Sequence, residues 1–367
     1  MSDKKLTVAL LFGGRSSEHV VSCVTAAGVY RALDKERFNA IPVGITKTGQ
    51  FVPVSESVLL SYALDSDPLP EVAAGDERII WPLATDDHTL RVLDAQNQIT
   101  ELGTIDVAVP MLHGPFGEDG TVQGLCELAG LPYVGSGVLA SALCMDKHAL
   151  KVVLETAGVK VAPWNRISRQ QLAQDPQAAA RLDQGLNYPL FVKPARAGSS
   201  VGVTRVTEPG GLAAAVDTAL AEDHTALIES AITGREVEIG VLGGRGGASL
   251  RASDVIGEIR FTGRDFYDFE SKYLGGAGVE IVLPAEVTDA EYQALRDAAF
   301  KAFDAAGCAV YARIDFFLTA DGPVLNEINT LPGFTPFSMY PQLWEASGVS
   351  YSELITELIE LALEAQR

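Results

Sequence analysis

The segment RIDFFLTADGPVLNEINTLPG, residues 313–333, constrains the fold of this chain more than any other. Two runs rich in β-branched and aromatic residues flank the sequence ADG, whose Asp-Gly suits a tight turn, so the segment predicts a β-hairpin. A turn centred on the Asp of ADG pairs Asp315 with Glu327. The same register pairs Arg313 with Asn329. Because side chains two residues apart in a strand share a face, we expect these four polar groups on one side of the ribbon.

The opposed carboxylates of this hairpin indicate a metal site. Directly paired like charges destabilise a hairpin, and a cation between Asp315 and Glu327 removes that repulsion. Carboxylate and amide oxygens suit Mg²⁺, which keeps its other coordination positions for water and substrate phosphates. The alternative is an edge hairpin with a solvated charged face, but such a face requires neither Arg313 nor the Pro-Gly turn after Asn329.

Composition excludes several classes of partner. The 367 residues suffice for two or three domains and carry a formal net charge of −20. Nucleic acids and anionic membranes require a basic surface, so neither is expected as a partner. No apolar run approaches the roughly 20 residues of a membrane span, and the amino terminus lacks a secretory pattern. The cysteines form no CxxC pair, which argues against zinc and fits a reducing cytoplasm. They are Cys23, Cys126, Cys144 and Cys308.

The amino-terminal part of the chain has the pattern of an α/β fold. Residues 6–12 are a continuous apolar run, followed by a Gly-Gly turn and a helix that opens near Ser16. Residues 38–45 and 105–112 are further predicted strands, and the loop HGPFGEDG follows the second, at the kind of strand end where ligands gather. The glycine turn lacks full GxGxxG spacing, so it supports a dinucleotide site only weakly. Residues 46–102 are irregular, and we assign them no role.

A second glycine-rich loop, PARAGSSVGV, follows Lys193 at the end of a predicted strand. Small residues let backbone N–H groups approach a phosphate closely, and the lysine adds a positive charge. GxxxxGK[ST] does not occur in the chain, so a P-loop fold is excluded. Lys147 is expected on a helix with its ammonium in solvent. Glu236 and Glu238 alternate with apolar residues and are expected on an outward polar face.

The remaining elements follow from periodicity. Residues 260–283 combine aromatic residues and glycines in a long loop, which is typical of a lid. Predicted helices span residues 121–129, 169–182, 288–306 and 351–365. Predicted strands span residues 161–167, 189–193 and 226–232.

Eight motifs follow one another along the chain, and together they are more specific than any one of them. They are LFGGRSSEHVVS, HGPFGEDGTVQG, MDKH, VKPARAGSSVGV, GREVEIGVL, YDFESKYL, RIDFF and NEINTLPGFTPFSMYP. This set resembles the D-alanine-D-alanine ligases of the ATP-grasp superfamily. The resemblance implies an α/β chain with an ATP-grasp fold and an N-terminal Rossmann-like domain. The implied domains are residues 1–140 for the Rossmann-like substrate domain, 141–232 for the central ATP-grasp subdomain, and 233–367 for the C-terminal subdomain with the metal site and lid.

The resemblance also implies the cofactor residues. Asp315, Glu327 and Asn329 would hold two Mg²⁺ ions, with Mn²⁺ as a substitute. Seven residues would bind ATP through its phosphates, its adenine and its ribose. They are Lys147 and Lys193 for the phosphates, Glu229, Ser230, Ala231 and Ile232 for the adenine, and Glu236 for the ribose.

The implied substrate and catalytic residues come from all parts of the chain. Those implied for catalysis are Glu18 for the ammonium of the first D-alanine, Ser199 and Tyr273 for closing the lid with Glu18, and Arg313 for the developing oxyanion. Those implied for substrate binding are His113 beside the first D-alanine, Gly333 at the oxyanion, and Lys272 and Ser338 for the carboxylate of the second D-alanine.

The implied reaction is ATP-dependent ligation of two D-alanine molecules through an acylphosphate, for peptidoglycan precursor synthesis, by a cytoplasmic homodimer. Three alternatives stay open: a D-alanine–D-lactate depsipeptide ligase, another ATP-grasp carboxylate-amine ligase, and a non-catalytic nucleotide-binding protein with this fold. The Lys272-Tyr273 pair resembles the dipeptide-forming enzymes. The acidic hairpin and Arg313 argue against loss of catalysis.

Overall fold

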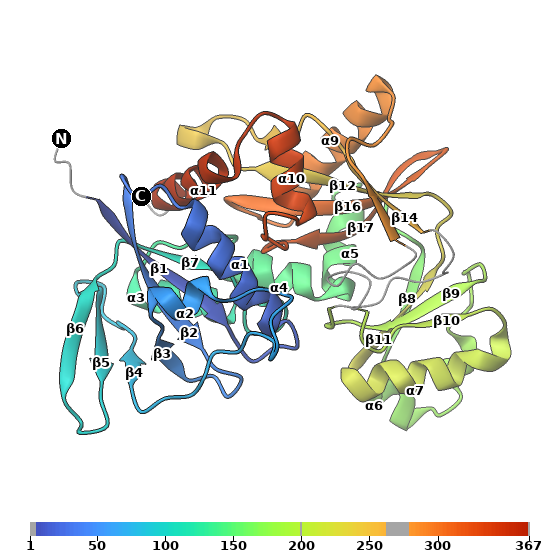
Figure 1. Ribbon diagram of the computed structural model, residues 1–367. Coiled ribbons are helices and arrows are strands. Elements are labelled where there is room, and N and C mark those ends of the chain that lie inside the picture. Colours follow the sequence, from blue (N-terminus) through green and yellow to red (C-terminus); the bar gives the residue numbers. More distant parts are fainter. Residues whose placement is uncertain (1–4, 199, 262–278, 366–367) are drawn as a thin grey trace.

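The computed structural model describes residues 5–198, 200–261 and 279–365. Within these residues the strands form four sheets. Three of them lie around the region where the N-terminal, central and C-terminal parts of the chain meet, and the fourth, three-stranded sheet lies at the outer edge of the N-terminal part (Figure 1).

The N-terminal sheet has the strand order β3-β2-β1-β7. β1 (Leu6–Gly13) runs parallel to β2 (Phe38–Ile45) and to β7 (Val107–Pro110). β3 (Phe51–Pro53) adds an antiparallel edge. The three predicted strands are confirmed, and the continuous apolar run of β1 is explained by burial of the strand on both faces.

Different helices cover the two faces of this sheet. α1 (His19–Ala32) and α11 (Tyr351–Ala365) pack on one face, together with alternate residues of β1. α3 (Thr121–Ala129) packs on the other face. A helix from the far end of the chain therefore completes the core that β1 begins. The helices predicted over residues 121–129 and 351–365 are confirmed as α3 and α11.

Residues 46–102, to which we assigned no role, contain regular structure. α2 (Glu56–Leu60) precedes a three-stranded antiparallel sheet of β4 (Arg78–Ile80), β5 (Thr89–Leu93) and β6 (Ile99–Thr104). Its strands are short, and β6 is mostly exposed, so neither length nor alternation signals them clearly.

The central sheet has the order β10-β9-β11-β8 and is antiparallel in every pairing. Its strands are β8 (Trp164–Ser168), β9 (Leu190–Pro194), β10 (Thr204–Val206) and β11 (Thr225–Ser230). α7 (Leu212–Glu222), preceded by the 3-10 turn η2 (Pro209–Gly211), packs against β9 and β11.

The helix predicted over residues 169–182 is wrong as a single helix. α6 (Arg169–Gln174) ends before Asp175, and only a 3-10 turn, η1 (Ala178–Arg181), follows. The residue before a proline disfavours helical backbone, and Asp175 accordingly adopts extended dihedral angles ahead of Pro176.

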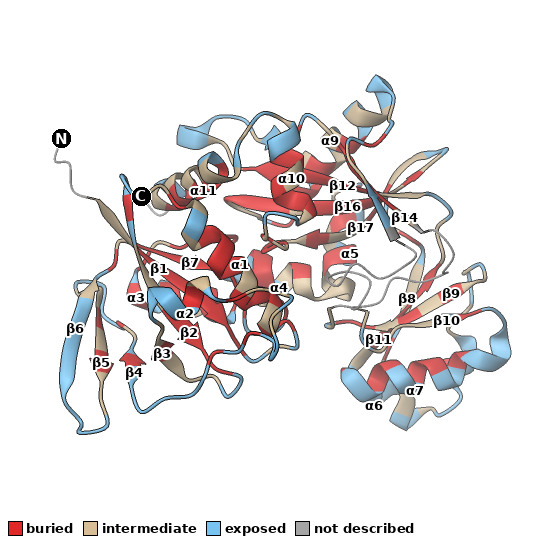
Figure 2. Ribbon diagram, viewed as in Figure 1, coloured by how far each residue is buried: buried red, intermediate tan, exposed pale blue. Residues whose placement is uncertain are grey.

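The C-terminal sheet has the order β15-β14-β12-β16-β17, and β13 pairs with β12 outside that path. Its strands are β12 (Arg235–Leu242), β13 (Arg251–Ala252), β14 (Gly257–Phe261), β15 (Val279–Val282), β16 (Tyr311–Thr319) and β17 (Gly322–Asn329). The helices around it are α4 (Val138–Met145), α5 (Lys147–Thr156), α9 (Asp289–Ala305), α10 (Met339–Ala346) and the turn η3 (Arg245–Gly247). Buried residues run along β12 and β16, whereas the outer strand β6 is exposed (Figure 2).

The hairpin of β16 and β17 has the predicted pairing for a different reason from the one expected. Asp315 lies opposite Glu327, and Arg313 lies opposite Asn329. The turn, however, has two residues rather than three, because Thr319 pairs with Gly322. A β-bulge at Asp315/Phe316 restores the register by adding one residue, Asn326, to β17.

Helix α9 begins with a capping box that offers a test of local stability. Thr288 Oγ1 accepts a hydrogen bond from the Glu291 amide at 3.3 Å, and the Glu291 carboxylate accepts one from the Thr288 amide at 2.7 Å. Thr288→Ala should lower the free energy of unfolding by about 1 kcal/mol, because an orphan helix N–H loses its acceptor. Urea unfolding followed by circular dichroism measures the change. Thr288→Ser keeps the cap and should stay within a few tenths of a kcal/mol of wild type; equal stability of all three proteins would contradict the role of the cap.

Candidate active site

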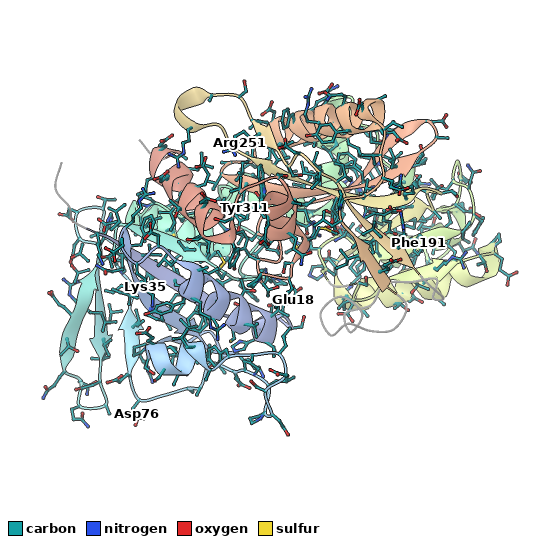
Figure 3. All side chains as sticks on the ribbon, turned by 45° about the horizontal axis from the view of Figure 1, so that its top comes forward. Glu18, Lys35, Asp76, Phe191, Arg251 and Tyr311 are labelled. Carbon is teal, nitrogen blue, oxygen red and sulfur yellow. The ribbon has the colours of Figure 1, made fainter. Side chains whose placement is uncertain are left out.

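A cavity of about 1800 Å³ lies where the three parts of the chain meet. Glu18 lines it from the N-terminal end of α1, and Phe191 lines it from β9 of the central sheet (Figure 3). The cleft-facing side of the β16–β17 hairpin contributes Arg313, Asp315 and Glu327. The cavity therefore brings together residues that are far apart in the sequence.

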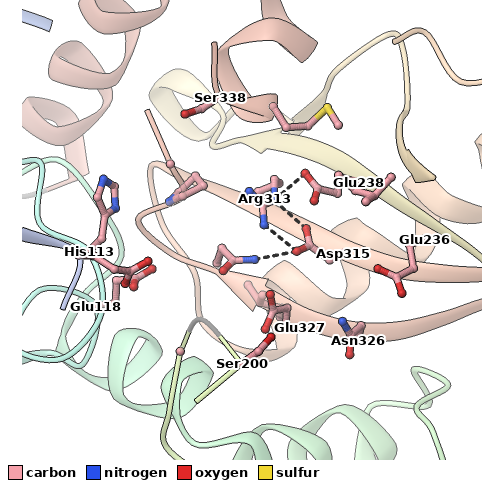
Figure 4. A pocket seen from close by; sticks show the side chains of 18 of the residues that line it. His113, Glu118, Ser200, Glu236, Glu238, Arg313, Asp315, Asn326, Glu327 and Ser338 are labelled. Carbon is pink, nitrogen blue, oxygen red and sulfur yellow. Dashed lines mark hydrogen bonds and ion pairs between the residues drawn. The ribbon is translucent and has the colours of Figure 1, made fainter. Parts of the chain in front are cut away.

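Arg313 is the buried cation of the hairpin. Its Nε and Nη2 donate to the two carboxylate oxygens of Asp315, both at 2.8 Å. Nε also lies 3.0 Å from Oε2 of Glu238, on the neighbouring strand β12 (Figure 4). Burial alone would lower the pKa of Arg313, but Asp315 and Glu238 together hold that pKa well above its ordinary value. The guanidinium is thus fixed in place and charged.

Glu238 corrects one sequence prediction. We expected it on an outward polar face, yet it is buried and lines the cavity. It lies directly opposite Asp315 in the β12–β16 ladder, so two carboxylates face each other with Arg313 between them. The sequence contained a signal for this position. Glu238 lies two residues from Glu236 in an alternating strand, so both side chains share one face, and a site residue at 236 places 238 on the same side.

The hairpin oxygens fit a magnesium site. Asp315 and Glu327 are cross-strand partners, and the Asn329 side-chain amide donates to Asp315 Oδ2 at 3.0 Å. Among the described residues, no group of three or more His, Cys, Asp and Glu side chains is arranged to hold a metal ion. The candidate set therefore has two carboxylates and one amide, which leaves coordination positions for phosphate and water, as Mg²⁺ prefers.

The bulge on β17 adds a residue that the sequence analysis missed. Asn326 lines the cavity together with its neighbour Glu327, although consecutive residues of a regular strand point to opposite faces (Figure 4). A bulge places two residues opposite one and so allows both side chains onto the same face.

A buried chain of charges links β11, α5 and β9 at one side of the cavity. Glu229 Oε1 is 3.2 Å from Lys151 Nζ, and its Oε2 is 2.7 Å from Lys193 Nζ. Burial acts to raise the pKa of Glu229, but the two lysines outweigh it and leave that pKa lowered. Burial lowers the pKa of Lys151 despite the attraction of Glu229. Glu229 is thereby held as an anion that positions Lys193. Both of its carboxylate oxygens contact lysines.

Helix α5 carries two lysines, Lys147 and Lys151. Lys147 lines the cavity and donates from Nζ to the Ala197 carbonyl at 2.7 Å, so the expectation of a solvated lysine is wrong. Lys151 was missed, although it lies one helical turn further on the same face of the helix, a spacing visible in the sequence.

Another part of the cavity carries His113 and two acids, Glu18 and Glu118. His113 is buried, and its Nδ1 donates to the Leu331 carbonyl at 3.2 Å. Burial lowers the pKa of His113 even though Glu18 opposes this shift, and the lowered pKa favours the neutral ring. Burial, with a contribution from Glu18, raises the pKa of Glu118 to about 8. Glu118, in the HGPFGEDG loop, was not singled out from the sequence.

The other predicted site residues divide into two groups. Those that line the cavity are Ser230, Ala231, Ile232, Glu236, Gly333 and Ser338. Those that lie outside the described residues are Ser199, Lys272 and Tyr273. Ser338 precedes α10, and its Oγ accepts a hydrogen bond from the Thr335 amide at 3.0 Å.

Known proteins are similar to the chain over nearly its whole length. Residues 7–136 match the family described as D-ala D-ala ligase N-terminus, and residues 153–360 match D-ala D-ala ligase C-terminus. The D-alanine–D-alanine ligase of Pseudarthrobacter chlorophenolicus is 49% identical over 363 residues, which cover 98% of this chain and 94% of that protein. The corresponding protein of Kineococcus radiotolerans is 48% identical over 370 residues, which cover 99% and 98%.

Solved structures agree with this match. The VanG D-Ala:D-Ser ligase of Enterococcus faecalis superposes with a TM-score of 0.82 at 33% identity, covering 98% of this chain and 100% of that one. The D-alanine-D-alanine ligase from Coxiella burnetii also has a TM-score of 0.82, at 30% identity, covering 99% and 95%.

The sheets and the cavity between them are those of an ATP-grasp ligase, as expected from the sequence. More particularly, the chain belongs to the D-alanine–D-alanine ligase family. The structure contains no helix, among the residues it describes, that could span a membrane.

The raised pKa of Glu118 predicts a specific dependence of stability on pH. The folded protein keeps the proton up to a pKa of about 8, whereas the ordinary value is 4.5. Between these values the folded state binds more protons than the unfolded state, so this group makes the free energy of unfolding fall as pH rises. Glu118→Gln removes the titration and retains an acceptor for the Gly114 amide. The fall between about pH 5 and about pH 8 should therefore become shallower.

Urea unfolding of the wild-type and Glu118→Gln proteins across this range measures the effect. Glu77→Gln, at an exposed position, is the matched control and should parallel wild type. Parallel curves for Glu118→Gln and wild type would rule out a raised pKa at Glu118.

Proposed function

We propose that this chain joins two D-alanine molecules to D-alanyl-D-alanine, converting ATP to ADP and phosphate, for peptidoglycan precursor synthesis. The observation that carries this proposal is the convergence of Glu18, Arg313 and the Asp315–Glu327 pair on one cavity, in a member of a ligase family. An ammonium partner, an oxyanion partner and a metal-binding pair are the groups that a phosphate-activated amide synthesis requires.

ATP binds between the central and C-terminal sheets in this proposal. Lys147 and Lys193 contact its phosphates, and both line the cavity. The hinge of Glu229, Ser230, Ala231 and Ile232 meets the adenine, and Glu236 takes the ribose hydroxyls. Because Glu229 already binds two lysines, the hinge meets the adenine through its backbone, and the Glu229 side chain serves to orient Lys193.

Asp315, Glu327 and Asn329 hold two Mg²⁺ ions, for which Mn²⁺ can substitute. When bound, the ions neutralise the charge that collects on the transferred phosphoryl group. Oxygen-only donors at this hairpin fit such ions better than they fit zinc, which prefers sulfur and nitrogen.

The remaining residues orient the amino acids. Glu18 binds the ammonium of the first D-alanine, beside His113. The carboxylate of that D-alanine attacks the γ-phosphorus of ATP, and ADP leaves. The amine of the second D-alanine then attacks the acylphosphate carbon, and phosphate departs. Arg313 and the Gly333 amide stabilise the negative oxygen of the tetrahedral species. Ser338, with Lys272, binds the carboxylate of the second D-alanine.

The lid and the assembly complete the proposal. Ser199 and Tyr273 join Glu18 in closing the lid, which keeps water from the acylphosphate. The domains divide at residues 1–140, 141–232 and 233–367, and the protein acts as a cytoplasmic homodimer.

A second candidate product is D-alanyl-D-serine. It is favoured by the likeness to the VanG D-Ala:D-Ser ligase, which equals in TM-score the likeness to the Coxiella burnetii ligase. The two candidates share every step before the attacking amine.

Mass identification of the product tests both candidates. Purified protein with ATP, Mg²⁺ and D-alanine should yield D-alanyl-D-alanine and one ADP per dipeptide. Competition reactions with added D-serine or D-lactate should still yield mainly the D-alanine dipeptide. An excess of the product with D-serine or D-lactate would show that D-alanine is not the preferred second substrate. ATP hydrolysis at a rate independent of D-alanine would reject the function.

Glu327→Gln tests the hairpin metal site. The variant should stay folded, because the repulsion between Glu327 and Asp315 disappears, but should lose Mg²⁺-dependent turnover by about a hundredfold or more. ADP formation against Mg²⁺ concentration, with Mn²⁺ binding followed by electron paramagnetic resonance, gives the measurement. Asp321→Asn, in the exposed turn of the same hairpin, should behave as wild type. Full activity with unchanged ion binding in Glu327→Gln would refute the site.

A further inference from the structure

His19 is a buried histidine that the proposed mechanism does not use, and both nitrogens of its ring are engaged. It is the first residue of α1, directly after Glu18, and is 1% exposed. Its Nδ1 lies 2.6 Å from the Gly14 carbonyl, and its Nε2 lies 3.0 Å from the Val72 amide. A carbonyl can only accept and an amide N–H can only donate, so Nδ1 carries the proton and Nε2 is the acceptor. The ring therefore links two separate backbone segments.

The first of these segments is the glycine turn after β1. Gly13 and Gly14 have φ values of +91° and +92°, which favour glycine. The Gly13 amide donates to Ser22 Oγ at 2.8 Å, and the Gly14 amide donates to the Ile45 carbonyl at 2.7 Å. These two hydrogen bonds hold the turn independently of His19. The Gly14 carbonyl therefore fixes the His19 ring in a position from which its Nε2 contacts Val72.

The second segment, residues 62–72, forms part of the cavity wall. It has no regular secondary structure, and Tyr62, Ala63, Leu64 and Asp65 line the cavity on the side of α1. Tyr62 is buried and its hydroxyl donates to the Glu71 carbonyl at 3.3 Å. Val72 is 1% exposed and packs close to Gly13 and Gly44. Between these two anchors most of the chain is partly or fully exposed, so its position depends on its ends.

Val72 receives a second contact from α1. Cys23 lies one turn beyond His19 on the same helix face, beside the Val72 backbone; burial raises the pKa of its thiol to about 12. Cys23 is 0% exposed, so it becomes accessible to reagents only when the segment lifts from α1. The reactivity of this thiol therefore reports whether the segment around Val72 stays packed against α1.

We propose that His19 is a positioning residue for the first amino acid substrate: through its Nε2 contact with Val72 it holds residues 62–72 against α1 and so fixes the cavity wall beside Glu18. The inference rests on the proposed function, in which Glu18 binds the substrate ammonium. It gives a role to a segment for which the sequence suggested none. In the proposed function ATP binds between the central and C-terminal sheets, so we expect its binding to be independent of this anchor.

Two substitutions separate the two hydrogen bonds of the ring. His19→Asn places an amide near the Nδ1 position, which keeps a donor for the Gly14 carbonyl and removes the acceptor for Val72. His19→Gln extends an amide oxygen toward Val72 and gives up the Gly14 contact. His19→Asn should raise the KM for D-alanine about tenfold, the scale of one lost buried hydrogen bond, with the KM for ATP unchanged within about twofold. His19→Gln should recover most of the D-alanine affinity.

Thiol labelling provides a readout that does not depend on turnover. Alkylation followed by peptide mass spectrometry should show Cys23 reacting about tenfold faster in His19→Asn than in wild type. Cys126, buried on α3 away from this segment, should react at an unchanged rate. D-alanine should slow the labelling of Cys23 in the wild-type protein.

The outcomes are distinguishable. Equal rises in both KM values, unchanged labelling of Cys23, or a His19→Gln variant no better than His19→Asn would each overturn the anchor. If wild type forms no ADP in response to D-alanine, the proposed function fails, whereas the labelling still tests the anchor. Should His19→Asn not fold, Tyr62→Phe removes the Glu71 contact at the other end of the segment without altering α1. That variant should shift D-alanine affinity and Cys23 labelling in the same direction, and no shift would overturn the proposal.

Discussion

Two buried carboxylates on neighbouring strands, Glu238 and Asp315, depend on a single guanidinium between them. An uncompensated charge in such a place costs several kcal/mol, on the order of 3–5 when one partner of a buried pair is removed. The register of β12 against β16 is therefore fixed from both faces: apolar pairing such as Ile239 with Ile314 on the core side, and this charge triad on the cavity side. A shift by one residue would bury the acids and expose the core.

Sequence patterns predicted the hairpin pairing because two errors in its local geometry cancelled. The turn is one residue shorter than expected, and the bulge at Asn326 adds the residue back before Glu327. A bulge depends on the twist of the whole sheet, which alternation of residue types does not encode. Lys147 and Glu238 were misplaced for a related reason: a lone charge on an amphipathic element looks solvated until tertiary packing brings other elements over it. The resemblance to the ligase family implied a phosphate contact for Lys147 but implied no role for Glu238.

In the proposed function, an acidic chain binds a triphosphate through local rather than global charge. With a formal net charge of −20, the long-range field repels an anion, so the lysines near the cavity must act at short range. Glu229 holds Lys193 and Lys151 close together, which like charges would otherwise resist. The arrangement gives two ammonium groups in fixed positions, at the price of one buried anion.

Helix α11 has a consequence for the order in which the molecule assembles. Its residues share one core with β1 and α1, yet it is synthesised long after them. A ribosome delivers the chain amino terminus first, so the earliest strand emerges with one apolar face covered only in part, by α1. The central sheet, whose described core residues all lie between β8 and β11, can consolidate in the meantime. The part of the molecule that is made first is thus finished last, and it is the part whose exposed face chaperones would have to shield during translation.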